Sequence, residues 1–182
     1  MFMEDITTSI KWIDLGLPVL WADRNLGAKE IYDKGNYYAW GELIPKNLYT
    51  RETYLYKEDF KINKYEVPTL NQYKELFTKC TWTWINDYEG SNTAGFIIKH
   101  SNNHIFFPAT YLSFNGDYHI STGGYWTSTY NKDFVNFVHY IMFHSNGLSV
   151  NDSYPHTGKS IRLIKKINNY ISSKNLSSQT LY

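Results

Sequence analysis

The chain has 182 residues, a length that suits one domain with a hydrophobic core of its own. Its charge is nearly balanced, with 18 Lys and Arg against 17 Asp and Glu. Because such a chain lacks the basic footprint that a phosphate backbone requires, we expect no nucleic-acid partner. Cys80 is the single cysteine, which excludes an internal disulfide and a cysteine-based zinc site.

Two further features of composition bear on location and function. No stretch approaches the ~20 apolar residues of a membrane span, so we expect no membrane insertion. The first residues, MFMEDITTSIKW, lack a basic segment followed by an apolar run, so we expect no secretory signal. The chain holds 17 Tyr, 10 Phe and 6 Trp. Since Tyr and Trp combine apolar area with a polar tip, this composition suits both a core and a recognition surface.

The N-terminal third predicts little regular structure. Short strands are expected at 12–15 and 19–21, and a short helix at 28–34 would end at Gly35. Residues 43–66 contain charge and tyrosine without a clear period, so we expect an ordered but irregular excursion there.

The best local signal predicts a helix over residues 70–79. Thr69 is a helix-capping residue, and Gln72 stands three positions later as its reciprocal partner. Apolar side chains then recur at helical spacing, namely Leu70, Tyr73, Leu76 and Phe77.

After Cys80 the apolar pattern changes to period two, which predicts strands joined by turns. The expected strands are 81–85, 94–98, 104–107, 125–129, 136–144, 148–150 and 160–164. Asn146-Gly147 predicts a hairpin turn, because both residues accept a positive φ. We expect one domain over residues 1–166, followed by an Asn- and Ser-rich extension at 167–182.

Nine segments in order resemble a known family. They are DLGLP…LWA (14–22), NLGA (25–28), YYAWGE (37–42), VPTLNQYKEL (67–76), CTWTW (80–84), IFFPAT (105–110), GGYWTST (123–129), FHSNGLSV (143–150) and GKSIRLI (158–164). The series is similar to bacterial and phage domains related to formylglycine-generating enzymes (the sulfatase-modifying factor-like group), which occur in gut Bacteroidetes and their phages. Some members are the variable proteins of diversity-generating retroelements.

The resemblance implies an α+β, C-type lectin-like fold. Such a fold has a twisted antiparallel sheet, one or two short helices and paired terminal strands. Trp12–Asp14 should therefore lie beside Ile161–Ile164.

The chemistry of the family is not expected here. Formylglycine-generating enzymes hold copper with a cysteine pair, whereas this chain has only Cys80. Related sulfoxide synthases use three histidines, but His100 and His104 flank an expected turn, and His139 and His144 fall on opposite faces of a strand. The calcium-binding triplets of animal lectins are missing as well. We therefore expect no enzyme, no metal and no cofactor; a degenerate enzyme of the formylglycine-generating type is the lesser alternative.

Two polar loops with aromatic residues, 130–136 and 151–157, flank the expected hairpin around Asn146 and are the candidate ligand-binding surface. Loops of this composition supply adaptable hydrogen bonds and rigid contact area. In the retroelement-diversified relatives, the variable positions fall in this C-terminal region. The candidate residues are Tyr130, Asn131, Asp133, Asn136, Asn151, Asp152, Tyr154 and His156.

Other residues are expected to be structural. Trp40 and Trp126 are interpreted as core anchors, and Gly123-Gly124 as permitting a bend or a close backbone approach. Arg162 stands between apolar residues, and since an unpaired buried charge is costly, it should pair with a carboxylate such as Asp14 or Glu42.

The sequence thus predicts a non-enzymatic ligand-binding module on a phage virion or an extracellular surface, recognising a host-surface glycan or protein through its C-terminal loops. The alternative is a structural role as a decoration protein. In that case the chain would form a homo-oligomer or contact other virion proteins through residues 43–66 or the C-terminal extension.

Overall fold

The structure is a computed structural model that describes residues 10–55, 61–62, 65–110, 112–114, 117–119, 122–134 and 136–167. The predicted extension at 167–182 lies outside these residues beyond position 167, as does part of the predicted excursion at 43–66.

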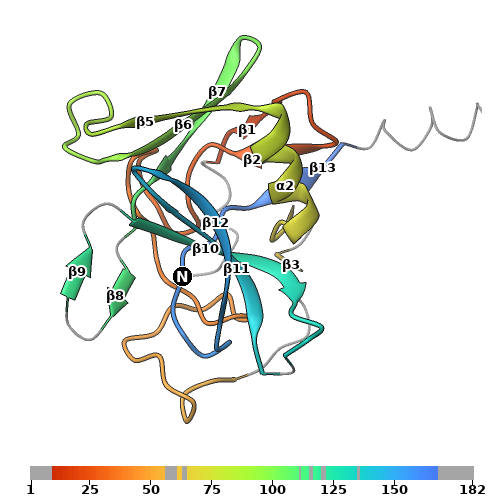
Figure 1. Ribbon diagram of the computed structural model, residues 1–182, viewed down its shortest axis with the longest axis vertical. Coiled ribbons are helices and arrows are strands. Elements are labelled where there is room, and N and C mark those ends of the chain that lie inside the picture. Colours follow the sequence, from red (N-terminus) through yellow and green to blue (C-terminus); the bar gives the residue numbers. More distant parts are fainter. Residues whose placement is uncertain are drawn as a thin grey trace, which may run out of the picture.

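The strands of the described residues form small antiparallel sheets (Figure 1). A five-stranded sheet has the order β1-β2-β13-β4-β3, with the bounds Trp12–Ile13, Val19–Ala22, Ile164–Lys166, Tyr65–Glu66 and Lys61–Ile62. A three-stranded sheet consists of β5 (Thr81–Ile85), β6 (Gly95–His100) and β7 (Asn103–Pro108). Another consists of β10 (Thr122–Tyr130), β11 (Val138–His144) and β12 (Gly147–Ser153). Strands β8 (Leu112–Phe114) and β9 (Asp117–His119) form a separate hairpin.

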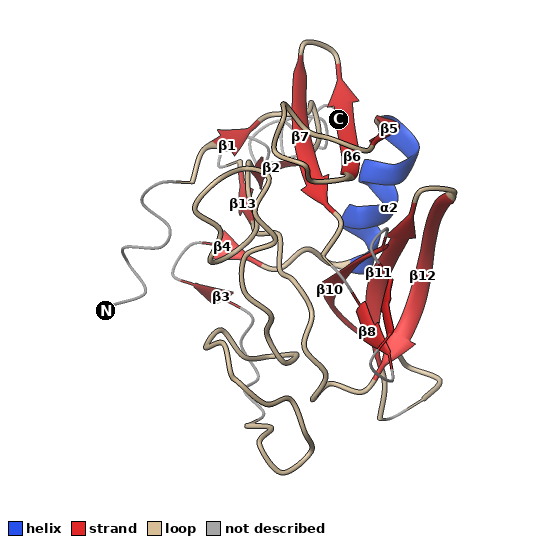
Figure 2. Ribbon diagram, turned by 90° about the vertical axis from the view of Figure 1, so that its left-hand side faces the viewer, coloured by secondary structure: helices blue, strands red, loops and turns tan. Residues whose placement is uncertain are grey.

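Helix α2 (Leu70–Lys79) lies near both three-stranded sheets (Figure 2). It has the bounds that the sequence predicts, and its capping box is confirmed. The backbone N–H of Gln72 donates to Thr69 Oγ1 at 3.2 Å, and the N–H of Thr69 donates to Gln72 Oε1 at 2.7 Å. These contacts span three residues, so the sequence alone suffices to start this helix.

The predicted α+β, C-type lectin-like fold is wrong, because the described residues are mostly β and hold the one helix α2 among several small sheets. The helix expected at 28–34 does not form. The Asp33 carboxylate instead accepts the backbone N–H groups of Lys29 and Glu30, at 3.2 and 3.0 Å, and holds a turn. Gly35 follows with φ +69°, where a Cβ would lie 2.5 Å from the Leu26 carbonyl oxygen, so only glycine fits.

The predicted pairing of the terminal strands is also wrong. Strand β2 lies between β1 and β13, and it pairs with both. The closing strand begins at Ile164 rather than at residue 160. The preceding residues run beside β2 without forming a ladder; the carbonyl of Leu163 accepts from Ala22 N–H at 3.0 Å and that of Ile161 from Leu26 N–H at 2.9 Å.

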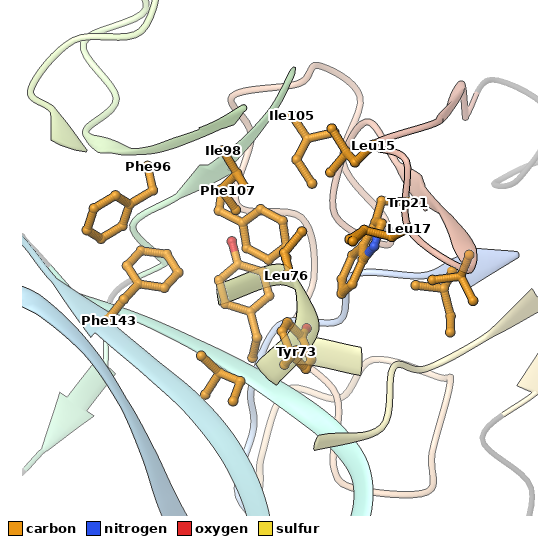
Figure 3. Packing of buried hydrophobic residues seen from close by; sticks show 14 residues of the cluster. Leu15, Leu17, Trp21, Tyr73, Leu76, Phe96, Ile98, Ile105, Phe107 and Phe143 are labelled. Atoms are coloured by element: carbon orange, nitrogen blue, oxygen red, sulfur yellow. The ribbon is translucent and has the colours of Figure 1, made fainter. Parts of the chain in front are cut away.

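The main core packs α2 against the sheets (Figure 3). Tyr73 and Leu76 of the helix are fully buried in it. The ring of Tyr73 meets Trp21 of β2 edge to face, with 5.3 Å between centroids. Phe143 stacks on Tyr125 at 5.5 Å. The Phe143 ring lies directly over Gly123, where a Cβ would come within 2.2 Å of it; the predicted close approach at Gly123 is confirmed.

A second core lies on the other face of the β10–β11 pair. Ile141 and Phe143 of β11 belong to the main core, whereas Val138 and Tyr140 contact the second. Trp126 is fully buried there. Its Nε1–H donates to the Tyr38 carbonyl at 2.7 Å, and Trp40 Nε1–H donates to the Thr127 carbonyl at the same distance. Both tryptophans are therefore core anchors, as predicted.

Arg162 is fully buried and binds neutral oxygens. Its guanidinium donates to Asn25 Oδ1 at 2.9 Å, to the Ala22 carbonyl at 2.9 Å and to the Phe106 carbonyl at 2.7 Å. It also stacks on the Phe107 ring, 4.3 Å from the centroid. The predicted pairing with Asp14 or Glu42 is wrong. Three oriented oxygens and an aromatic face replace the carboxylate, and burial still lowers the pKa of the group.

Replacing Arg162 by Met keeps much of the side-chain volume but leaves the three buried oxygens without their donors. We expect the free energy of unfolding to fall by at least about 3 kcal/mol, because each unpaired buried acceptor costs roughly 1–3 kcal/mol. Urea denaturation measures this loss. Lys166→Met is the matched control, since its bond to Glu66 lies on the surface and should contribute less than about 1 kcal/mol. Equal losses in the two variants would contradict the role given to Arg162.

Candidate functional site

The two candidate loops meet at one end of the β10–β12 sheet. Tyr130, Val138 and Ser153 are direct partners in the strand register and form one row across the three strands. Loop 130–136 leaves this row from β10, and the residues after Ser153 leave it from β12. The sheet register therefore places the two loops side by side, as the sequence suggests.

A run of four aromatic side chains joins the loops, and we call it the aromatic platform: Phe134, Phe137, Tyr154 and His156. Phe137 packs on Tyr154 with 4.6 Å between ring centroids. Phe134 meets Phe137 edge to face at 6.3 Å, and His156 stacks on Tyr154 at 5.4 Å. Phe134 is 62% exposed and Tyr154 50% exposed. Large aromatic rings so exposed and stacked together form a contact surface rather than a core.

The sequence prediction contains half of this platform. It names Tyr154 and His156 and misses Phe134 and Phe137, because it selects residues with hydrogen-bonding side chains and phenylalanine has none. The detectable signal is Phe134, an apolar side chain within the expected polar loop, with Phe137 three positions later at the start of the expected strand.

Two candidate residues of the first loop have structural contacts. Asn131 is buried, and its Oδ1 accepts the backbone N–H groups of Asp133 and Phe134 at 2.8 and 3.2 Å. This side chain shapes the loop and positions Phe134. Tyr130 is 45% exposed and packs against Trp40, with 4.3 Å between centroids. Asp133 and Asn136 are exposed, and they adjoin Phe134 and Phe137 in the sequence.

Asn151 and Asp152 belong to β12 rather than to a loop, so they point to opposite faces of the sheet. Asp152 lies directly opposite His139, and its Oδ1 is 2.5 Å from His139 Nδ1. Asn151 lies opposite Tyr140, and its Nδ2 donates to Ser149 Oγ at 2.6 Å. The structure thus separates Asp152 from Asn151, although the two are neighbours in the sequence.

Lys159 is a buried cation that the sequence analysis did not single out. Only 5% of the residue is exposed, and its ammonium lies 4.1 Å from the Tyr140 ring centroid and 4.9 Å from that of Trp126. Its backbone is held by Tyr38, with hydrogen bonds of 3.0 and 2.9 Å in both directions. Burial lowers the pKa of Lys159 to about 8. The available signal was a lysine beside the apolar closing segment, in GKSIRLI.

The histidines and the cysteine do not converge. His100 and His104 lie on β6 and β7, paired with Asn103 and Lys99 across a tight hairpin. Cys80 caps the C-terminal end of α2, and burial raises the pKa of its thiol. Within the described ranges, no group of three or more His, Cys, Asp and Glu side chains is placed to hold a metal ion.

Comparison with known proteins adds no relative. No protein-family profile, no curated protein and no solved structure matches this chain. The described part of the chain contains no helix with the length and apolarity needed to cross a membrane.

The buried ammonium of Lys159 predicts an unusual rise of stability with pH. Below pH 8 both the folded and unfolded states carry the charge, and the folded state bears the full cost of burying it. As the pH rises from 8 toward 10.5, the folded state loses the proton first, so the free energy of unfolding increases. Between about pH 7 and about pH 9.5, we expect the free energy of unfolding of the wild type to increase by up to about 2 kcal/mol more than that of Lys159→Met.

Urea denaturation of both proteins at the two pH values checks this gain. Tyrosine titration affects both proteins and largely cancels in the difference. Lys166→Met provides the control, since an exposed ammonium carries no burial cost. A constant difference between wild type and Lys159→Met across the range would contradict the burial argument.

Proposed function

We propose that this protein is a non-enzymatic binding module that recognises a host-surface glycan through the aromatic platform and the polar residues around it. The observation that supports this most directly is the series of ring contacts Phe134–Phe137–Tyr154–His156, in which Phe134 and Tyr154 are exposed. A sugar ring has apolar C–H faces and a polar rim. An exposed aromatic ring offers a flat apolar surface to the C–H faces, and neighbouring polar groups form hydrogen bonds with the hydroxyls of the rim.

The platform is held rigidly, which favours binding. Asn131 fixes the backbone that carries Phe134, and Tyr154 leaves directly from the end of β12. Thr157 Oγ1 donates to the Tyr154 carbonyl at 2.9 Å and lies 3.0 Å from Ser153 Oγ. A preformed surface loses little conformational entropy when the ligand binds.

The rim supports a sugar more than a large protein partner. Asp133, Asn136, Ser153 and Thr157 each adjoin a platform residue in the sequence and supply neutral or singly charged hydrogen-bonding groups. A host-surface protein is the competing ligand class.

The place of the protein is part of the same proposal. We propose display on a phage virion or an extracellular surface, within the group related to formylglycine-generating enzymes. This assignment rests on the nine ordered motifs of the sequence alone, since the fold differs from the one that the resemblance implies and no known protein matches the chain.

The test is a glycan array printed with bacterial surface polysaccharides, followed by titration of the best hit. We expect Phe134→Ala combined with Tyr154→Ala to weaken binding at least about tenfold, since central aromatic contacts typically contribute more than 1 kcal/mol. Tyr32→Ala, at an exposed tyrosine outside both loops, should leave the affinity unchanged. A double variant that folds and binds like the wild type would place the site elsewhere, and an array without hits would reject glycan recognition.

A second candidate function is assembly. The segment 43–55, within the predicted excursion, exposes three large apolar side chains: Ile44 at 62%, Leu48 at 60% and Leu55 at 66%. The segment lies at one end of the molecule, away from α2 (Figure 1). Exposed aliphatic residues gathered on one segment suit contact with another protein surface, as in a decoration protein.

Size-exclusion chromatography with light scattering tests this second function. If the segment mediates self-assembly, the wild type forms a homo-oligomer, and replacing Ile44, Leu48 and Leu55 by Ser returns it to a monomer. Val150→Ser, at another exposed apolar residue, is the control and should leave the oligomer intact. A monomeric wild type at about 100 μM would argue against self-assembly, since a specific interface of standard size binds more tightly than this.

A further inference from the structure

We infer that Lys159 is the anchor for an anionic group of the ligand, so that the glycan recognised here carries a carboxylate or a sulfate. This inference rests on the proposed function and adds the chemical class of the ligand. It follows from the burial of the Lys159 side chain, its missing counterion and its place beside the candidate loops.

Lys159 differs from every other buried charge of the described residues. Asp23 pairs with Arg24 at 2.9 Å, and Glu42 pairs with Lys46 at 2.6 Å. Arg162 has three oxygen acceptors. No ion pair or side-chain hydrogen bond within the described residues involves the ammonium of Lys159, and two aromatic faces are its only neighbours of note. A buried cation is costly unless something compensates it, and a ligand oxyanion would do so.

The ammonium is within reach of a ligand. Three side-chain polar atoms in the described part of the chain are fully covered and without a partner, namely Trp21 Nε1, Tyr73 Oη and His100 Nδ1. Lys159 Nζ is not among them although it also lacks a hydrogen bond, so its tip touches solvent. The stem is buried, and the charged end lies against the rings of Tyr140 and Trp126.

The two rings that contact the ammonium lie in a strand row close to the one from which the loops leave. Trp126, Tyr140 and Asn151 are direct partners across β10, β11 and β12, so their side chains form one row on one face of the sheet. Ser153 follows Asn151 on the same face and is hydrogen-bonded with Thr157. Lys159 is two residues beyond Thr157. A sugar seated on Tyr154 and His156 thus has Ser153, Asn151 and then the ammonium in order along this face.

A charged anchor of this kind gives selectivity. A carboxylate or sulfate on the sugar would accept from the three N–H groups of the ammonium in a site of low dielectric, where such bonds are strong. A neutral sugar has no negative charge to pair with the ammonium of Lys159. The rings of Tyr140 and Trp126 hold the lysine in place before the ligand arrives, so the anion meets an ordered donor.

The experiment measures the affinity of three oligosaccharide probes by isothermal titration calorimetry: oligogalacturonate, its neutral methyl ester and a sulfated galactan fragment. We expect the wild type to bind an acidic probe at least about tenfold more tightly than the neutral one. Lys159→Met, which keeps the apolar stem between the two rings, should remove this preference and leave the affinity for the neutral probe unchanged. Lys166→Met controls for the loss of one positive charge and should keep the preference. The two acidic probes distinguish a carboxylate from a sulfate site.

A second measurement does not depend on a complete ligand or on the folding of a variant. Sodium glucuronate and sodium sulfate are added to wild-type protein labelled with ¹³C-lysine, and the Cε resonance of Lys159 is followed by NMR. A saturable shift of that resonance, with those of exposed lysines such as Lys166 unchanged, supports the anchor.

The outcomes separate the two proposals. If binding depends on Phe134 and Tyr154 but is equal for acidic and neutral probes, in both the wild type and Lys159→Met, the anchor is overturned. Glycan recognition is then still supported. No shift of the Lys159 resonance with either anion overturns the anchor as well. An anion-induced shift at Lys159 in a protein that binds no glycan supports the anion site and rejects the glycan as its source.

Discussion

The buried guanidinium of Arg162 is the interaction on which the arrangement of the sheets depends. Its three donors reach Asn25, Ala22 and Phe106, which belong to the segment after β2, to β2 itself and to β7. One side chain therefore ties the five-stranded sheet to the β5–β7 sheet near the centre of the molecule. Because the partners are neutral oxygens with fixed directions, the arginine specifies geometry more than it adds attraction. Asn25 Nδ2 also donates to Tyr125 Oη at 3.0 Å, which extends the network to β10.

The β10–β12 sheet connects this network to the candidate site. One face of β10 and β11 packs on the main core through Tyr125, Ile141 and Phe143, and the other packs on the second core through Trp126 and Tyr140. A strand pair covered on both faces is stiff, since each side chain is confined by its neighbours. The loops that carry the aromatic platform leave the same end of this sheet, from β10 and from β12, and Lys159 lies against the β10–β11 pair. The same strands therefore hold the loops rigidly and place them at the end of the sheet.

Local signals predicted the elements better than the site. Helix α2 and the turns around Asn146 depend on contacts between residues a few positions apart, which a sequence displays directly. The predicted loop 130–136 follows β10 as expected, because polar, aromatic segments between strands are exposed in most folds, whereas residues 151–153 of the other predicted loop belong to β12. Of the four side chains of the aromatic platform, the sequence prediction contained Tyr154 and His156. Asn131 turned inward as a loop-shaping residue and Phe134 turned outward, and neither orientation follows from residue type.

The sequence by itself determined the helix, most strand positions and a β-rich second half with polar loops around one hairpin. Only the tertiary structure decided the order of the strands, the partners of Arg162 and the position of Lys159. These depend on contacts between distant segments, such as Arg162 with Asn25, 137 positions apart, and Trp126 with Tyr38, 88 positions apart. No local pattern encodes such a contact, because a buried charge selects its partners only once the sheets have brought their backbone oxygens together.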